Sequence, residues 1–341
     1  MEATLEEIAR YIDGCKTAAI SGHVNADGDS IGSVLALTCC LRSLGIAVAP
    51  LLADDATVPD RYAGFEGYDD FVFSGRYEAT PDIFISVDTS TEERMGYSLP
   101  VMRRSPRSVS IDHHKDSAIS ADLTHVEADV ASACMLVWEL AKVLCGAPSA
   151  AVASACYAGT LTDTGMFQFQ NCDARCMQAV GEFVDAGANP YEIATDVYQS
   201  KAIGLIKLEG RVADRLALTP RGTIAYSWVA KADFDELGVT KSESEGLVDI
   251  VRSAKGIEIG ILMRDEGGII RCNIRSKKHL DVSIIAKRFG GGGHVAASGF
   301  SLRGELAELL PRIVDVLVEI EDQIASGAYG SDFDTRGLAG A

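Results

Sequence analysis

The chain has 341 residues, of which 47% are apolar, and a formal net charge of −18 at pH 7. This length is long for one hydrophobic core and sufficient for two domains. No apolar run approaches the roughly 18 residues that a membrane helix needs, and the acidic start differs from a signal peptide. We therefore expect a cytoplasmic protein without a membrane partner. This negative charge also argues against binding of long duplex nucleic acid, because proteins that bind it usually do so through basic surfaces.

Two further features of the composition bear on function. Nine cysteines, an odd number without a compact spacing pattern, are typical of reduced thiols rather than of a disulfide framework. Between Arg271 and Phe289, six basic residues stand against the single acid Asp281. This local basic stretch suits a few phosphate groups, although an ordinary solvated helix and strand face is the alternative.

The first half of the chain alternates apolar, β-favouring runs with helical patterns. Alternating strands and helices predict a largely parallel sheet. The predicted strands lie at 17–21, 47–52, 83–87 and 108–111, and the predicted helices at 5–12, 30–44, 131–144, 149–161, 173–186, 191–198 and 202–216.

From Thr223 a second α/β pattern begins. Its elements are a strand at 224–229, a helix at 245–251, a hairpin of strands at 257–263 and 269–274, a strand at 298–302 and a helix at 306–324. We predict an α/β protein with four regions: a catalytic domain with a mainly parallel sheet at 1–187, a helical linker at 188–222, a smaller substrate-binding α/β domain at 223–326, and a disordered tail at 327–341. The active site is expected in a cleft between the two domains.

Three of the predicted strands each end in acidic and histidine residues. These residues are His23, Asn25, Asp27 and Asp29 after the first strand, Asp88 after the run at 83–87, and Asp112, His113 and His114 after the run at 108–111. In open α/β sheets, ligands bind beyond the carboxyl ends of the strands, so we expect these side chains to meet in one crevice. Carboxylates and imidazoles suit a pair of divalent cations such as Mn²⁺ or Mg²⁺.

The spacing of the first group is informative. His23, Asn25, Asp27 and Asp29 lie two residues apart. In an extended segment all four side chains would point to one side, where they could serve two adjacent ions. A calcium-binding loop is excluded because neither register supplies the Glu that such a loop needs at its twelfth position. A helix N-terminus capped by Asp27 or Asp29 is the alternative.

The later motifs differ in specificity. Asp88 alone would more often be a cap or a turn former. Asp112, His113 and His114 are more specific, because a carboxylate and two imidazoles at the end of a buried strand are costly unless they bind something. Adjacent side chains diverge, so one histidine can bind a metal while the other faces the substrate or orients a ligand. Asp163, at the end of an apolar helix, is the expected last ligand.

Taken together, these motifs resemble a known family. The motifs His23-Val-Asn-Ala-Asp-Gly-Asp29, Asp88-Thr-Ser90, Asp112-His-His114 and Thr162-Asp-Thr-Gly165 resemble the four motifs of the DHH phosphoesterases, and Gly290-Gly-Gly-Gly-His294 followed by Ala297-Ser-Gly299 resembles the nucleotide-binding signature of the DHH-associated domain. Five motifs in this order make the resemblance specific. The second-domain signature and the length are similar to the bifunctional oligoribonuclease and pAp phosphatase (nanoRNase) group, whose relatives also hydrolyse cyclic di-AMP and pApA.

The resemblance implies two Mn²⁺ ions, for which Mg²⁺ or Co²⁺ could substitute. One ion would be held by His23, Asp27 and Asp88, and the other by Asp29, Asp88, His113 and Asp163. Asn25 and Asp112 would orient ligands. His114 would contact the scissile phosphate, protonate the leaving oxygen, or donate to a ligand. Substrate would be bound by Arg275, Ser276, Gly291, Gly292, Gly293 and His294.

The implied activity is hydrolysis of small nucleotides or short single-stranded RNA to nucleoside monophosphates, by a hydroxide shared between two metals. A metal-dependent nucleotide sensor without catalysis is the alternative from another class. A RecJ-like exonuclease and a pyrophosphatase are the alternatives among enzymes. A homodimer is left open by the sequence.

Overall fold

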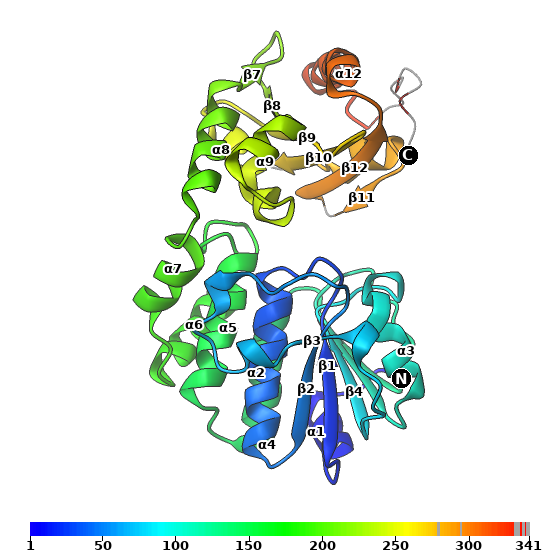
Figure 1. Cartoon of the computed structure of the whole chain (residues 1–341), viewed down its shortest axis with the longest axis vertical. Coiled ribbons are helices and arrows are strands. Elements are labelled where there is room, and N and C mark those ends of the chain that lie inside the picture. The colour runs from blue at the N-terminus through cyan, green and yellow to red at the C-terminus, as the bar shows by residue number, and fades with distance from the viewer. Residues whose placement is uncertain (278–279, 294, 331–334, 336–337, 339–341) are drawn as a thin grey trace. The chain divides into compact units, whose positions relative to one another are not determined.

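The computed structural model describes residues 1–277, 280–293, 295–330, 335 and 338, without the side chains of residues 242 and 245. The chain packs as two compact units, Met1–Ser200 and Lys201–Ala341. Each unit consists of a sheet flanked by helices (Figure 1).

The first unit contains a parallel sheet. Within the described residues its order is β3-β2-β1-β4-β5-β6, and every pair of neighbours is parallel. The strands are β1 (Thr17–Ser21), β2 (Ala47–Leu52), β3 (Val72–Phe73), β4 (Ile83–Val87), β5 (Ser108–Asp112) and β6 (Leu123–Val126). The chain starts in the middle, runs to one edge, and crosses back to continue from β4. The reversal of strand order between β1 and β4 is the place where such sheets bind ligands.

Helices cover both faces of this sheet. They are α1 (Leu5–Ile12), α2 (Gly28–Ser43), α3 (Leu99–Arg104), α4 (Ala133–Cys145), α5 (Ala150–Asp163), α6 (Ala174–Asp185) and α7 (Pro190–Tyr198). Alternate strand residues enter different cores: Ile85 and Val87 pack with α1, α2, α4 and α5, whereas Phe84 packs with Val101 and Met102 of α3. Burial on both faces explains why these strands are apolar runs rather than alternating patterns.

Close packing of α2 against α5 depends on two glycines. A Cβ at Gly32 would lie 2.7 Å from the carbonyl oxygen of Ala155 in α5, and a Cβ at Gly159 would lie 3.1 Å from Asp29 Oδ1 in α2. Any larger residue would push the helices apart. Because α2 begins near the point where α5 ends, this contact brings the start of α2 to Asp163.

The second unit contains a mixed sheet in the order β11-β12-β10-β9-β8-β7, in which β8 and β9 are parallel and the other pairs antiparallel. Its strands are β7 (Ala217–Leu218), β8 (Ile224–Val229), β9 (Ile259–Asp265), β10 (Ile269–Ser276), β11 (Gly292–Gly293) and β12 (Ala297–Arg303), and its helices are α8 (Ile203–Asp214), α9 (Lys231–Leu237), α10 (Val248–Ser253), α11 (Ser283–Arg288) and α12 (Leu306–Ser326). Ile224 packs in a core with α11 and α12, and Ala225 in a core with α8, α9 and α10.

Most sequence-predicted elements are confirmed, including the parallel sheet and the hairpin of β9 and β10. The sequence did not reveal β3, β6, β7, β11, α3, α9 and α11, because elements this short carry too little periodicity. The predicted helix at 245–251 is a 3₁₀ turn (Ser242–Leu247) followed by α10. Beyond α12, the Tyr329 hydroxyl donates to the carbonyl oxygen of Asp281, and Leu338 is buried in the second unit.

Within the described part of the chain, no helix combines the length and apolarity required to cross a membrane. The nine cysteines, all of which are described, are free thiols, as predicted.

A buried carboxylate anchors the last helix of the second unit. Glu321 in α12 is 1% exposed and accepts hydrogen bonds from Thr219 Oγ1, Arg221 N, and both N and Oγ1 of Thr223, at 2.5 to 2.9 Å. Burial alone would raise the pKa of Glu321, but these donors outweigh burial and lower it.

We predict that Glu321→Gln lowers the free energy of unfolding by about 1–3 kcal/mol at pH 7, because the amide turns a donor toward donors. The pKa of Glu321 is lower in the folded than in the unfolded protein. The ionised side chain therefore contributes its full stabilisation at pH values above its pKa in the unfolded chain, and this contribution is lost as the pH falls through its pKa in the folded protein. The difference in the free energy of unfolding between wild type and Glu321→Gln should therefore narrow below about pH 4.5. Urea unfolding at several pH values measures it. Glu308→Gln, an exposed change in the same helix, should change stability by less than about 0.5 kcal/mol.

Candidate metal centre

Side chains from three strand ends and two helices meet beyond the carboxyl ends of the central strands. His23 follows β1, Asp88 follows β4, and His113 follows β5. Asp29 lies in the first turn of α2, and Asp163 is the last residue of α5. The structure therefore brings together the ligands expected at the point where the strand order reverses.

The loop between β1 and α2 differs from the expected extended segment. α2 already begins at Gly28, and Asn25 has a left-handed φ of 53°. Asp27 caps this helix, because its Oδ1 accepts from the backbone N–H groups of Asp29 and Ser30 at 3.1 Å. Its other oxygen, Oδ2, lies 3.6 Å from His23 Nε2. The prediction of one extended segment was wrong, and helix capping by Asp27 is compatible with a place in the cluster.

Asp88 lies between the two parts of the cluster. Its Oδ2 is 3.5 Å from His23 Nε2, and its Oδ1 is 3.5 Å from His113 Nε2. The side chain is 2% exposed, and the backbone has a left-handed φ of 51°, which Asp tolerates better than most residues. Each oxygen of one carboxylate thus faces a different imidazole.

The second part of the cluster is built around His113. Its Nε2 lies 3.8 Å from Asp29 Oδ2 and 3.9 Å from Asp163 Oδ2. Within the described residues, the sets that could hold an ion are His23, Asp27 and Asp88; Asp29, His113 and Asp163; and Asp88, His113 and His114.

The donor geometry fits divalent cations. The imidazole-to-carboxylate distances of 3.5 to 3.9 Å are too long for hydrogen bonds. They suit pairs of ligands that each lie about 2.0–2.2 Å from a shared ion. His23 Nδ1 lies 2.8 Å from the Val24 carbonyl oxygen, and His113 Nδ1 lies 3.3 Å from that of Val130. A carbonyl only accepts, so Nδ1 carries the proton and Nε2 is left as the ligand atom.

The pKa values show excess negative charge in the cluster. Burial, together with the charge of Asp88, raises the pKa of Asp29 to about 7. Burial and the charge of Asp29 raise the pKa of Asp163 well above its ordinary value. Burial opposes a charge on His113, but Asp88, Asp29 and Asp163 outweigh it and raise its pKa to about 11. These carboxylates repel one another, and a bound cation would relieve the repulsion.

Backbone and side-chain groups that the sequence analysis missed hold the cluster in place. Asp29 accepts from the N–H groups of Ala133 at 2.6 Å and Cys134 at 3.0 Å, at the N-terminus of α4. Asp54 Oδ2 accepts from the backbone N–H of Asn25 at 2.6 Å. Asp54 follows β2, so the signal that found the other residues, an acid after a predicted strand, would have found it as well.

His114 is held by Asp112. The Asp112 side chain is fully buried, and its Oδ1 accepts from the backbone N–H of His113 at 2.9 Å and lies 2.7 Å from His114 Nδ1. Burial would lower the pKa of His114, but the hydrogen bond to Asp112 and its charge raise it. The pair fixes the orientation of the imidazole next to the cluster.

The predicted substrate-binding residues lie in the second unit. Arg275 pairs with Ala297 across β10 and β12, and Gly293 pairs with Ser298 across β11 and β12, so both lie near the start of β12. Gly291 and Gly292 precede Gly293 in the same turn and strand. Ser276 is 4% exposed, and its Oγ has no hydrogen-bond partner among the described residues. His294 lies outside the described residues. The role of these residues stays a prediction.

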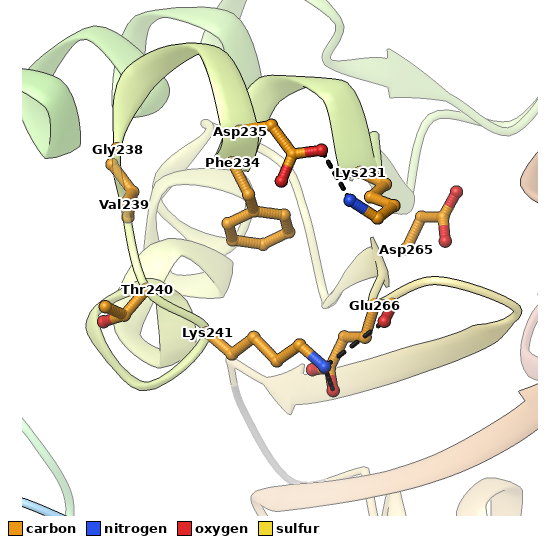
Figure 2. A pocket seen from close by; sticks show the side chains of 9 residues that line it. All are labelled: Lys231, Phe234, Asp235, Gly238, Val239, Thr240, Lys241, Asp265 and Glu266. Carbon is orange, nitrogen blue, oxygen red and sulfur yellow. Dashed lines mark hydrogen bonds and ion pairs between the residues drawn. The ribbon is translucent and has the colours of Figure 1, made fainter.

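A separate hollow of about 340 Å³ lies in the second unit, lined by residues of α9 and the segment after it and by the end of β9 (Figure 2). Lys231 pairs with Asp235, and Lys241 pairs with Glu266. Of the predicted substrate-binding residues that the structure describes, none lines this hollow. Because these lysines already have carboxylate partners, the hollow does not identify a ligand.

We predict that Asp88→Ala weakens Mn²⁺ binding at least tenfold, because one carboxylate serves both parts of the cluster. Isothermal titration and metal analysis after dialysis measure this. Mn²⁺ should also raise the melting temperature of the wild type more than that of the variant. Asp185→Ala, an exposed acid at the end of α6, should bind like the wild type. Unchanged Mn²⁺ affinity in Asp88→Ala would contradict the assignment.

Comparison with known proteins identifies both parts of the chain. The DHH family, N-terminal domain, matches residues 17–160, and the DHHA1 domain matches residues 221–321. The bifunctional oligoribonuclease and PAP phosphatase NrnA of Thermus thermophilus is 28% identical over 318 residues, covering 92% of each chain. The protein of the same name from Bacillus subtilis is 28% identical over 302 residues, covering 87% of this chain and 92% of the relative.

A solved structure shows the same fold. The exopolyphosphatase-related protein from Bacteroides fragilis has a TM-score of 0.87 at 23% sequence identity, covering 94% of this chain and 97% of that chain. The resemblance predicted from the five sequence motifs is confirmed by the matched domains. The chain contains a DHH-family N-terminal domain at residues 17–160 and a DHHA1 domain at residues 221–321.

Proposed function

We propose that this protein is a phosphoesterase that depends on divalent cations and hydrolyses small nucleotides to nucleoside monophosphates. Its proposed substrates are short RNA oligonucleotides, pAp, pApA and cyclic di-AMP. The observation that carries the proposal is Asp88, whose two oxygens face His23 and His113 separately. The names of the two NrnA relatives, oligoribonuclease and PAP phosphatase, support the substrate class.

The donor set supports two cation sites. We assign His23, Asp27 and Asp88 to one, and Asp29, Asp88, His113 and Asp163 to the other. We propose Mn²⁺, with Mg²⁺ or Co²⁺ as substitutes, because oxygen and imidazole ligands suit these ions. Bound there, such cations supply Lewis acidity that lowers the pKa of water and neutralises charge on phosphoryl oxygens.

The chain's own polar groups complete the proposed site. Asp112 holds His114 through Nδ1, and we propose that Nε2 contacts the phosphate or gives a proton to the leaving oxygen. Asn25, whose backbone is held by Asp54, orients the loop that carries His23 and Asp27.

In the second unit we propose that Arg275, Ser276, the N–H groups of Gly291 to Gly293, and His294 grip the part of the nucleotide that is not cleaved. The guanidinium and the buried Ser276 hydroxyl are donors of the kind that bind a terminal phosphate. The free cysteines support a cytoplasmic location, which we also propose. A homodimer stays a prediction.

Substrate profiling tests the proposed function. The purified protein, loaded with Mn²⁺, should release nucleoside monophosphate from at least one of pAp, RNA dinucleotides, pApA and cyclic di-AMP, and a chelator should abolish the release. Asp88→Ala should be inactive on all of them, because both cation sites lose a ligand. Failure of the metal-loaded wild type on all four substrates would refute the function.

A first prediction separates substrate binding from chemistry. Arg275→Ala should raise KM on nucleotides by about 10- to 100-fold and leave kcat and Mn²⁺ content nearly unchanged, because a charge-assisted hydrogen bond is lost away from the reacting bond. Hydrolysis of bis-p-nitrophenyl phosphate should fall much less. Arg303→Ala, at the exposed end of β12, is the matched control. Equal losses on both substrates would place Arg275 in the chemistry instead.

A second prediction concerns substrate length. The net charge of −18 should repel a long polyanion beyond the bound nucleotides. Dinucleotides to pentanucleotides should therefore be degraded at least about tenfold faster than a 20-mer near physiological salt, where the Debye length is about 8 Å. The difference should narrow as salt screens the repulsion. Measurements of kcat/KM across an RNA length series at two salt concentrations test this, and rates that rise with length would contradict it.

A further inference from the structure

Three serines form a row across the first sheet. They lie near the carboxyl ends of β1, β4 and β5, just before these strands reach the metal centre. Ser21 in β1 lies opposite Ser86 in β4, and Ser86 lies opposite Ser110 in β5. We call these residues the serine row. Their strand neighbours two residues earlier include Ala19 and Phe84, which pack in the core with α3, so the row faces that side of the sheet.

The three hydroxyls differ in their hydrogen bonds. Ser21 Oγ lies 2.6 Å from Ser98 Oγ, so this hydroxyl has a partner. Ser86 and Ser110 are each 1% exposed, and their Oγ atoms have no hydrogen-bond partner among the described residues. If these positions only needed small residues for packing against a helix, alanine would serve as well as serine. Packing therefore does not explain two buried hydroxyls that lack partners among the described residues.

A third such atom lies on the same side of the sheet. Asp112 follows Ser110 by two residues, so its side chain leaves β5 on the same face. Its Oδ1 is occupied by His113 and His114, whereas the buried Oδ2 has no donor among the described residues. Three buried polar atoms without partners, on two adjacent strands, are unusual in a folded protein.

The spacing of these atoms suits a shared water molecule. Neighbouring strands lie about 4.8 Å apart, so one water molecule can bridge the Ser86 and Ser110 hydroxyls. Residues two apart on a strand lie about 6.6 Å apart, and the longer Asp112 side chain shortens the gap to Ser110. A buried water needs two to four polar partners, and this place offers three.

We propose that Ser86 and Ser110 bind an ordered water that donates a hydrogen bond to Asp112 Oδ2. Both serines are then positioning residues that act through Asp112 on His114. The proposed binding of water is inferred from the three buried polar atoms alone. Its proposed effect on turnover also rests on the proposed function. Since Asp112 Oδ1 already holds His114, a donor on Oδ2 fixes the carboxylate plane and with it the imidazole.

A crystal structure of the full chain with Mn²⁺, at a resolution that shows ordered water, tests the binding site directly. We expect one water within hydrogen-bond distance of Ser86 Oγ, Ser110 Oγ and Asp112 Oδ2, and its loss in Ser110→Val. A dry site in the wild type, or a direct bond from either serine to Asp112, would overturn the proposal. This result does not depend on any enzymatic activity.

Kinetics test the positioning role with a nearly isosteric pair. Ser110→Thr keeps the hydroxyl and Ser110→Val lacks it, so both add similar bulk to the core. We expect kcat of Ser110→Val to be about tenfold below that of Ser110→Thr, with equal KM and Mn²⁺ content. Equal kcat values for the pair would overturn the role.

Two further variants serve as controls for the comparison of Ser110→Val with Ser110→Thr. Ser86→Ala removes a hydroxyl without adding bulk, and it should lower kcat if the water is bound as proposed, even should Ser110→Val fail to fold. Ser108→Ala is the matched control, because Ser108 lies on β5 with Ser110 and its hydroxyl donates to Asp122 instead. A loss of kcat in Ser108→Ala as large as in Ser86→Ala would assign the effect to strand stability and overturn the role. If the wild type turns over no nucleotide, the proposed function is refuted. The crystal structure still tests the proposed water site in that case, because it does not depend on activity.

Discussion

The architecture of the first unit depends on how it accommodates buried negative charge at the carboxyl ends of parallel strands. Asp29, Asp88 and Asp163 gather around His113, and Asp88 also faces His23. In a low-dielectric interior these carboxylates repel one another unless protons, imidazoles or cations compensate them. The raised pKa values of Asp29 and Asp163 show that two imidazoles are not enough.

Several features of the fold serve to hold these groups together. The reversal of strand order places the ends of β1 and β4 side by side, so that His23 and Asp88 meet. The glycines that let α2 and α5 approach bring Asp29 and Asp163 to the same place from two different helices. The N-terminus of α4 donates to both oxygens of Asp29 and stabilises its charge, as helix N-termini do for anions.

The second unit is organised on different principles. Its sheet is mixed, and helices on each face give it two cores of its own. It is also held by two buried carboxylates: Asp233 pairs with Arg211 and Arg215, and Glu321 accepts hydrogen bonds from the turn before β8. Burial opposes the charge of Asp233, but Arg215 and Arg211 outweigh it and lower its pKa to about 2. These networks stabilise the scaffold that carries Arg275 and Ser276, without contributing residues to the metal centre.

The sequence by itself determined the order and type of the long elements and most of the candidate ligands. Runs of apolar residues identify buried strands, and an acid or histidine directly after such a run marks the strand end, so His23, Asp88 and His113 could be predicted. The short elements β3, β6, α3 and α9 could not be predicted, because two to seven residues carry no clear period. Their formation depends on tertiary pairing and packing, which act only once the sheet exists.

Only the tertiary structure decided how these residues meet. Sequence spacing suggested one extended segment from His23 to Asp29, whereas the left-handed turn at Asn25 and the early start of α2 place Asp27 and Asp29 on a helix. The contacts of Asp29 with α4 and of Asp54 with Asn25, and the pairing of Ser86 with Ser110, join segments far apart in the chain. A hydrogen bond between distant segments leaves no periodic trace in the sequence, because its geometry is set by the packing of whole elements.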